Sequence, residues 1–273
     1  MTTDSGYPLL KQIPAVLRAR GYRLYTNEGR RLIDLWLTGG AAILGHTPPN
    51  ILHEIKNTAS RGLYSPLPHF TEGRYLKALS KIFPGRTFRL YYAPPQELSV
   101  FFDDGNAKLW RPFANSASPL EISENAPVLV PVLPGIQLWR RGLPFGLCVL
   151  AVQDSRLFDN DGLLARFPES DSLPPILLSV AVRGIYGIIK AAPERANKKF
   201  PRIEKALKKS LWRRTGIYLE LEEKPETTEW NALFQKFLTA GFLLPPCPSF
   251  PVILPGELSA GEEAKLAKML GEL

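Results

Sequence analysis

Hydrophobic and polar positions alternate in two short runs near the start of the chain, over residues 22–26 and 31–37. Alternation with a period of two is typical of a strand with one buried face. The two runs flank the segment Asn-Glu-Gly at 27–29, a turn signal placed where a hairpin requires it. This region therefore predicts a short β-meander.

The apolar spacing changes to a helical period after Pro48 and Pro49, which break the chain. Asn50 can cap a helix here, and one helical stripe is formed by Ile51, Ile55 and Ala59. A second helix is predicted from Thr71, which can cap it, to the stop signal at Pro84 and Gly85. Its apolar face consists of Leu76, Leu79 and Phe83.

The region 86–185 has a different texture, because strand-length apolar runs are separated by Pro, Gly, Asn and Ser. These runs are "RLYYA", "LSVFF", "APVLVPVL" and "LCVLAVQ". They predict a mixed or parallel sheet with few covering helices. The acidic pair Asp103 and Asp104, followed by Gly105, is interpreted as a turn between strands.

The last third of the chain predicts alternating helices and strands. Residues 176–192 are apolar enough for a buried helix, which is expected to continue into the basic stretch 196–214. A strand at 216–223, a helix and strand over 229–246, and a strand and helix over 251–273 follow. In the final helix Ser259 and Glu262 have capping-box spacing, and Leu266, Met269 and Leu270 face inward.

Composition narrows the class of protein. A chain of 273 residues with 45% hydrophobic residues can bury a sizeable core. The start of the sequence has no apolar signal segment, and no uninterrupted apolar run has the length of a membrane span, so a cytoplasmic protein without a membrane partner is expected. Cys148 and Cys247 lie in apolar contexts without metal-ligand or redox spacing, and His53 and His69 have no companions of a catalytic motif.

The formal net charge of +8 raises the question of an anionic partner. Much of the excess lies at 196–214, where apolar residues recur at helical spacing and most lysines fall between them. This pattern favours an amphipathic helix with a solvated basic face. A nucleic-acid surface is the less favoured alternative, because no recognisable nucleic-acid module accompanies it.

One stretch carries several uncommon residues in a recognisable order: "GYRLYTNEGRRLIDLWLTGGAAILGHTPPNILHEIKN", residues 21–57. It resembles the N-terminal signature of class III aminotransferases, the fold type I pyridoxal-phosphate enzymes that include glutamate-1-semialdehyde aminomutase and ornithine aminotransferase. The matching positions are Asp34, Gly39, Gly40, Gly45, His46 and Pro49. The segments at 173–190, 239–246 and 250–263 resemble the C-terminal part of the same family. In this resemblance His46 is a packing and hydrogen-bonding residue.

The resemblance implies an α/β fold, a reduced fold type I transferase-like domain with a mixed or parallel sheet and an α+β small domain at the C-terminus. The implied organisation is an N-terminal segment at 1–70 that packs with the small domain, a reduced central sheet domain at 71–185, and the small domain at 186–273. Family members build their site across a dimer interface, so a homodimer is also implied.

The family's cofactor-binding lysine opens a Gly-rich turn between two strands. When the chain is anchored on Leu143–Gly146, the lysine column falls on Gln137, and "LWRRG" follows in place of the glycines. The nitrogen of a glutamine amide is not nucleophilic, so it cannot form an imine with pyridoxal phosphate. No catalytic residue and no cofactor are therefore expected.

Other expected parts of the cofactor site are also replaced. Pro94 and Pro95 supply no N–H donors where the family holds the cofactor phosphate, and the run that follows reads as a strand. No strand that could carry the family's Asp-Glu pair is recognised between 103 and 125. Val252 stands where many members place an arginine for the substrate. Three remnants remain as candidate contacts for a small phosphate- or carboxylate-bearing ligand: Ser170, Arg140 and Arg141.

Three functions stay open. The first is a degenerate aminotransferase-like protein that acts as a binding, regulatory or partner protein. The second is an active pyridoxal-phosphate enzyme that uses Lys108, expected in a polar loop, or Lys190, expected late in a long helix. The third is a phosphate or nucleic-acid binder that uses the basic helix. The first is favoured.

Overall fold

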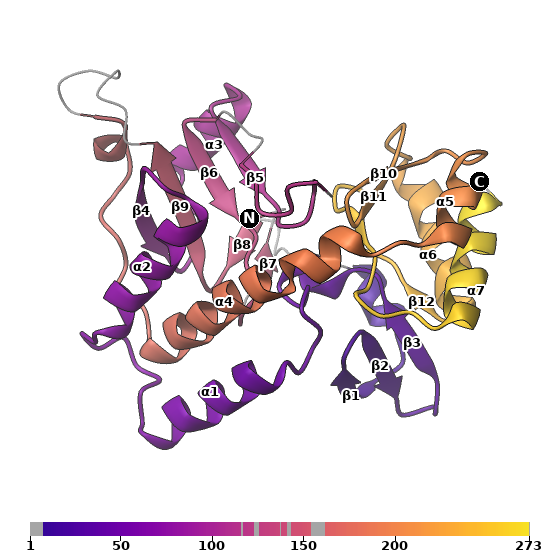
Figure 1. Cartoon of the computed structure of the whole chain (residues 1–273), viewed down its shortest axis with the longest axis horizontal. Coiled ribbons are helices and arrows are strands. Elements are labelled where there is room, and N and C mark those ends of the chain that lie inside the picture. Colours follow the sequence, from indigo (N-terminus) through magenta and orange to yellow (C-terminus); the bar gives the residue numbers. More distant parts are fainter. Residues whose placement is uncertain are drawn as a thin grey trace. The chain divides into compact units, whose positions relative to one another are not determined.

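A computed structural model describes residues 8–115, 117–122, 126–136, 138–140, 143–153 and 162–272. Within it the chain divides into two compact units (Figure 1). The first unit comprises Met1–Pro48, Phe113–Pro119 and Ala192–Leu273, and the second comprises Pro49–Pro112 and Leu120–Ala191. Both are mixed α/β structures, as expected for the fold class.

The N-terminal meander of the first unit forms as predicted. Strands β1 (Val16–Arg20), β2 (Arg23–Thr26) and β3 (Arg31–Asp34) pair antiparallel in that order, and β3 ends three residues earlier than the alternation suggested. Strand β12 (Phe242–Leu243) pairs in parallel with β3, so that the sheet joins the two ends of the chain. A short 3-10 helix at Pro8–Gln12 precedes β1.

The rest of the first unit is an α+β arrangement. Strands β10 (Trp212–Thr215), β11 (Tyr218–Leu221) and β13 (Val252–Ile253) form an antiparallel sheet. Helix α5 (Pro201–Leu207) packs against α7 (Ala260–Gly271), and α6 (Thr227–Thr239) packs against β12. The predictions for β11, α6, β12, β13 and α7 are confirmed, although β11 is central in its sheet rather than exposed.

The predicted continuous helix from 176 through the basic stretch is wrong. Helix α4 (Pro175–Asn197) ends before Phe200, and α5 begins afresh at Pro201. Proline is favoured in the first turn of a helix, where its missing N–H leaves no bond unmade. Residues 212–215 then form a strand, because the buried Trp212 pairs with Leu221 across the sheet. The lysines of this stretch are largely exposed, as the amphipathic interpretation required.

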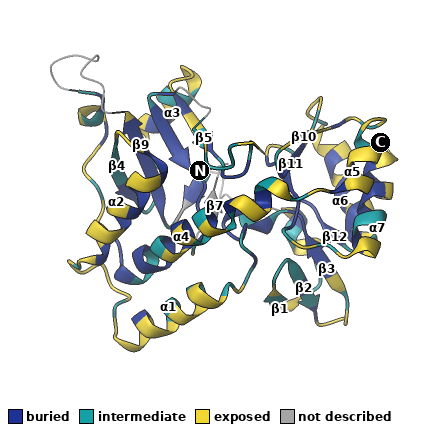
Figure 2. Cartoon of the chain, in the orientation of Figure 1, coloured by how far each residue is buried: buried dark blue, intermediate teal, exposed yellow. Residues whose placement is uncertain are grey.

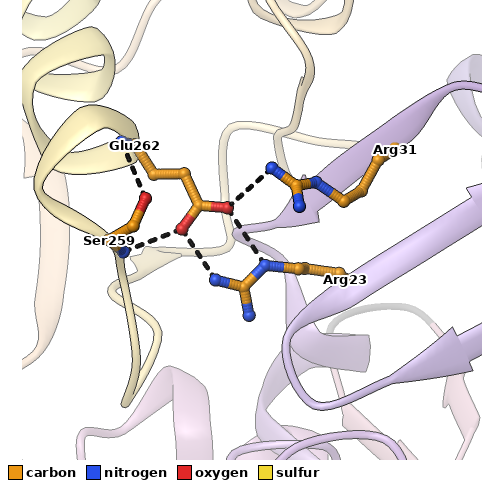
Figure 3. Close-up of polar contacts among 4 residues, drawn as sticks. All are labelled: Arg23, Arg31, Ser259 and Glu262. Atoms are coloured by element: carbon orange, nitrogen blue, oxygen red, sulfur yellow. Dashed lines mark hydrogen bonds and ion pairs between the residues drawn. The ribbon is translucent and has the colours of Figure 1, made fainter.

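The capping box of α7 also anchors the N-terminal hairpin (Figure 3). The Glu262 carboxylate accepts the backbone N–H of Ser259 at 2.8 Å and a two-point hydrogen bond from Arg23, at 3.0 and 2.7 Å. Arg31 pairs with the same carboxylate at 3.3 Å. Burial opposes ionisation, but these hydrogen bonds and charges outweigh it and lower the pKa of Glu262 to about 2. One carboxylate therefore ties residues 239 positions apart.

A four-stranded mixed sheet forms the core of the second unit, in the order β4 (Arg86–Tyr91), β9 (Cys148–Gln153), β6 (Val128–Pro131) and β5 (Ala107–Trp110). Only β5 and β6 run parallel. The inner strands β6 and β9 are almost wholly buried, which explains their uninterrupted apolar sequence (Figure 2). Strand β5 is a strand that the sequence analysis missed.

Four helices accompany this sheet: α1 (Pro49–Ser60), α2 (Thr71–Ile82), α3 (Glu97–Asp103) and the first part of α4. Helices α1 and α2 confirm the periodicity, but Asn50 and Thr71 lie inside them rather than capping them, and α1 is mostly exposed. The predicted strand at 98–102 is helical. Leu98 is buried in the core, with Phe101 and Phe102 packed against it, a spacing that suits a helix. Asp103–Gly105 therefore turns from a helix into β5, not between strands.

Helix α4 is the longest element, and by length and hydropathy it could cross a membrane. Its apolar sequence is interrupted by Arg183 and Lys190. Half of its most apolar window is buried within the protein. Two 3-10 helices, Leu37–Gly40 and Leu163–Arg166, and a hairpin of β7 (Leu138–Arg140) and β8 (Leu143–Phe145) complete the described elements.

Candidate functional site

The connection between the inner strands β6 and β9 is where the resemblance expects the cofactor lysine. Its middle folds into the β7–β8 hairpin, with Leu138 opposite Phe145 and Arg140 opposite Leu143. The backbone N–H of Gly146 then donates to Tyr92 O at 2.7 Å. Arg140 is thus the last residue of β7. Gln137 and Arg141 lie outside the described residues, so their assignments stay predictions from the sequence.

Helix α4 approaches the start of this connection closely. A Cβ atom added to Gly184 would overlap the carbonyl oxygen of Pro134, and one added to Gly135 would lie 3.9 Å from Ala181 Cα. Small side chains on α4 therefore let its backbone touch the chain directly after β6. Any side chain at position 184 would push this loop away.

Lysine is missing from a long part of the sequence around this connection. No lysine occurs from residue 109 to residue 189, a stretch that includes β6, β9 and everything between them. The flanking Lys108 lies on strand β5, not in the polar loop that was predicted, and its side chain is exposed. Lys190 lies late in α4, as expected, and is also exposed. The central strands thus offer no amine that could attack a carbonyl.

The end of β5 is the second place where cofactor chemistry would need a particular residue. Because β5 runs parallel to β6, their carboxyl ends lie at the same edge of the sheet. The resemblance expects an Asp-Glu pair late in such a strand. Here β5 ends at Trp110 and is followed by Arg111 and Pro112, so neither residue directly after the strand is a carboxylate that could pair with a pyridinium nitrogen.

The turn from β4 into α3 is the third place where cofactor chemistry would need particular groups. Pro94 and Pro95 have no N–H, as the sequence analysis noted. The helix that was not expected here is only seven residues long. Its first amides donate within the chain, from Leu98 to Pro95 O and from Ser99 to Gln96 O, both at 3.2 Å. These backbone groups do not form the cradle of free donors that a phosphate needs.

Ser170 lies in a segment that covers the edge strand β4. Its hydroxyl oxygen accepts the N–H of Leu90 at 3.1 Å, and the carboxylate of the next residue, Asp171, accepts the N–H of Tyr92 at 2.8 Å. Tyr91 donates to Pro168 O at 2.6 Å. These bonds satisfy backbone donors that an edge strand would otherwise expose. The Ser170 hydroxyl is therefore engaged with strand β4.

Asp34 and His46, from the N-terminal motif, meet in the first unit. One Asp34 oxygen accepts the backbone N–H groups of Trp36 and Leu37 at 2.8 and 2.9 Å, and the other lies 2.8 Å from His46 Nε2. The residues that follow are left-handed, with φ of 49° at Leu37 and 51° at Thr38. Such conformations cost about 1–3 kcal/mol each in non-glycine residues. The carboxylate and imidazole hold this turn in place, which supports a structural role for His46.

Arg195, which the sequence analysis passed over, is buried in the first unit. Its Nη2 donates to Ile43 O at 2.8 Å, and its guanidinium lies 5.4 Å from the centre of the Tyr22 ring. In the described part of the chain, Nη1 has no hydrogen-bond partner. Burial lowers the pKa of Arg195 and raises that of Tyr22. The sequence signal for this residue is weak: Arg195 is one arginine near the end of an otherwise largely apolar helix.

The described residues contain no group of histidine, cysteine and acidic side chains that could hold a metal ion. Cys148, which is buried, and Cys247 are both free thiols, in agreement with the absence of a predicted disulfide. Burial raises the pKa of Cys148 to about 12, so this thiol stays protonated and unreactive at neutral pH.

Comparison with known proteins places the fold. No family model matches the sequence. An uncharacterised protein of Treponema pallidum is 40% identical over 83 residues, 30% of this chain and 27% of that protein. A glutamate-1-semialdehyde 2,1-aminomutase of Lawsonia intracellularis is 39% identical over 67 residues, 24% of this chain and 16% of that enzyme. The matched segments thus span about a quarter or less of these relatives.

Solved structures match over nearly the whole chain. The acetylornithine aminotransferase of Elizabethkingia anophelis aligns with a TM-score of 0.63 at 9% identity, over 95% of this chain and 93% of that one. A transaminase with PLP bound aligns with a TM-score of 0.63 at 13% identity, over 95% and 90%. At such identities the likeness establishes the fold. The protein has the fold of class III aminotransferases, as its motifs implied.

Proposed function

We propose that this protein has kept the aminotransferase fold, lacks imine chemistry, and works as a binding, regulatory or partner protein. The observation that carries this is the absence of lysine from 109 to 189, which covers both central strands and their connection. The conclusion holds for any alignment of the turn and does not depend on assigning the lysine column to Gln137.

The residues present do not fit pyridoxal phosphate as aminotransferase-like sites hold it. Arg111 follows β5 where a carboxylate would be needed, and the amides at the start of α3 are engaged within the chain. What supports some ligand capacity is the set of remnants Ser170, Arg140 and Arg141, which we assign to a small phosphate- or carboxylate-bearing ligand. We further infer that the protein is cytoplasmic and homodimeric, the dimer by analogy with the fold.

The direct test is covalent labelling. Full-length protein is incubated with pyridoxal phosphate, reduced with borohydride, digested and mapped by mass spectrometry. We expect no cofactor absorbance band beyond that of free pyridoxal phosphate, and only sparse labelling spread over exposed lysines. Lys108→Arg and Lys190→Arg should leave this pattern otherwise unchanged.

Stoichiometric labelling of a single lysine, abolished by one of these substitutions, would instead establish the active-enzyme alternative. Sedimentation equilibrium tests the dimer separately. A species of one chain across the concentration range would remove that part of the proposal.

A further inference from the structure

Helices α1, α2 and α4 of the second unit and the chain between α1 and α2 surround a cavity of about 580 Å³. This is within the range of pockets that bind small molecules, roughly 300–1,000 Å³. Its lining is unusually basic. Five cationic side chains contribute to it, against one carboxylate, Glu54; the cations are Arg61, Arg74, Lys77, Lys81 and Arg183.

The single carboxylate is already engaged. Glu54 Oε2 accepts Arg183 Nε at 2.9 Å, and the Glu54 side chain is only 16% exposed. Within the described ranges, no ion pair joins Arg61, Arg74, Lys77 or Lys81 to a carboxylate. Five cations less one carboxylate leave an excess of four positive charges around this cavity.

Three of these cations form a row along α2. Arg74, Lys77 and Lys81 follow one another at spacings of three and four residues, which places them on the same face of the helix. Like charges at these spacings destabilise a helix by a few tenths of a kcal/mol per pair, and no acidic residue interrupts the row. An anion in the cavity would attract all three side chains and so offset the repulsion between them.

Aromatic rings hold two of the cations beside the cavity. The Arg74 guanidinium lies 4.3 Å from the centre of the Phe70 ring, and Lys81 Nζ lies 4.8 Å from that of Tyr186. Cation–π contacts attract the cation without neutralising its charge. The rings themselves are substantially exposed, 56% for Phe70 and 41% for Tyr186.

Neutral polar groups complete the lining. Ser179 donates to Ile176 O at 3.2 Å, so Thr58, whose hydroxyl lies 3.1 Å away, is the donor in that pair. The N–H of Thr71 donates to His69 Nδ1 at 3.2 Å, which leaves Nε2–H as the donor of the neutral imidazole. A histidine with that tautomer can donate to an acceptor oxygen.

From this geometry we propose that the cavity is a binding site for a small polyanion that carries several phosphate groups. A single phosphate would offset only part of the four excess charges, whereas a chain of two or three phosphates matches both the charge and the length of the row on α2. The cavity lining includes none of the residues on which the proposed function depends, so this proposal stands independently of that one.

Isothermal titration calorimetry of the full-length protein with inorganic triphosphate tests the site. Orthophosphate, which has a single phosphate group, is the comparison ligand. We expect triphosphate to bind more tightly than orthophosphate, with an affinity that falls as salt is raised. The double substitution Lys77→Gln/Lys81→Gln should weaken triphosphate binding by about tenfold or more, since two charge-assisted contacts are lost.

The matched control is Lys208→Gln/Lys209→Gln, which removes the same charge from two exposed lysines after α5 in the first unit. We expect it to change the affinity by less than about twofold, because it leaves the lining of the cavity intact and exposed charges are screened by salt. Thermal melts of both variants establish that they are folded.

Absence of triphosphate binding, or equal weakening by both double substitutions, would overturn the proposal. None of these readouts involves pyridoxal phosphate. Stoichiometric labelling of a single lysine in the previous experiment would therefore refute the proposed function and leave this site standing.

Discussion

The two units of this protein keep different parts of the sequence pattern that they share with aminotransferases. In the first unit the polar motif residues have partners within the chain: Asp34 holds a left-handed turn and pairs with His46, and Glu262 caps α7 and binds Arg23. In the second unit no lysine occurs from residue 109 to residue 189, and the first amides of α3 donate within the chain. The polar motif residues of the first unit thus have a role in holding the fold that needs no catalysis, whereas the second unit carries the sequence differences on which the proposed function rests.

The comparison also separates two kinds of positive charge. At the end of the basic stretch in the first unit, Arg214 pairs with Glu204 and Arg213 pairs with Glu222, both at 2.9 Å. The row on α2 in the second unit has no such partner among the described residues. Part of the basic stretch that is conspicuous in the sequence is thus paired with carboxylates, whereas the row on α2 is not paired among the described residues.

The largest effects should come from glycines at close backbone contacts, one in each unit. In the first unit, Gly216→Ala would drive a Cβ into Phe113 O at a residue with φ of 61°, so both overlap and a left-handed backbone are penalised. We expect a loss of more than about 3 kcal/mol of unfolding free energy. Urea denaturation followed by circular dichroism measures it.

In the second unit, Gly184→Ala should cost about 1–3 kcal/mol, because Pro134 must move away from α4. The matched control is Gly73→Ala in α2, where an added Cβ meets nothing within 4 Å. There the better helix propensity of alanine should stabilise by about 0.5–1 kcal/mol. Stability gained at position 184 would mean that the loop after β6 is not held against the helix.

The next effect is electrostatic and belongs to the first unit. Glu262→Gln should cost about 3 kcal/mol at neutral pH, since Arg23 loses its charged partner in a largely buried site. Because folding lowers the Glu262 pKa to about 2 from its usual 4.5, this stabilisation is complete above pH 4.5 and is lost as the pH falls toward 2.

The stability difference between wild type and Glu262→Gln should therefore shrink across that acidic window, as followed by denaturation at successive pH values. Glu220→Gln, at an exposed position on β11, is the control and should change stability by less than about 0.5 kcal/mol. A difference that stays constant down to pH 2 would show that the carboxylate charge is not what stabilises the hairpin.

The smallest effect tests Ser170 in the second unit. Ser170→Ala removes the acceptor of the Leu90 N–H on the edge strand and should cost about 1 kcal/mol. Hydrogen exchange of the Leu90 amide should accelerate, with Tyr92, which is bound by Asp171, as the internal reference. Unchanged exchange together with a lost anion affinity would favour a ligand role for this hydroxyl over an edge-covering one.

The elements that were predicted correctly have local signals. The turn at 27–29, the capping box of α7 and the stop after α2 each depend on residues within one or two turns of chain. The five-residue run at 98–102 has no such signal, because five apolar residues satisfy both a strand and a helix. It is helical because Leu98, Phe101 and Phe102 meet the core that way, and Trp212 is in a strand because Leu221 lies opposite.

The sequence by itself determined that no amine is available along the central strands, since a missing residue type needs no coordinates, and it determined the local signals that start and end many of the elements. Tertiary structure alone decided that Glu262 receives Arg23, that Ser170 covers β4, and that cations from α2, from α4 and from directly after α1 gather around one cavity. Local periodicity is set by neighbours along the chain, whereas these contacts join segments whose proximity depends on how the whole core packs.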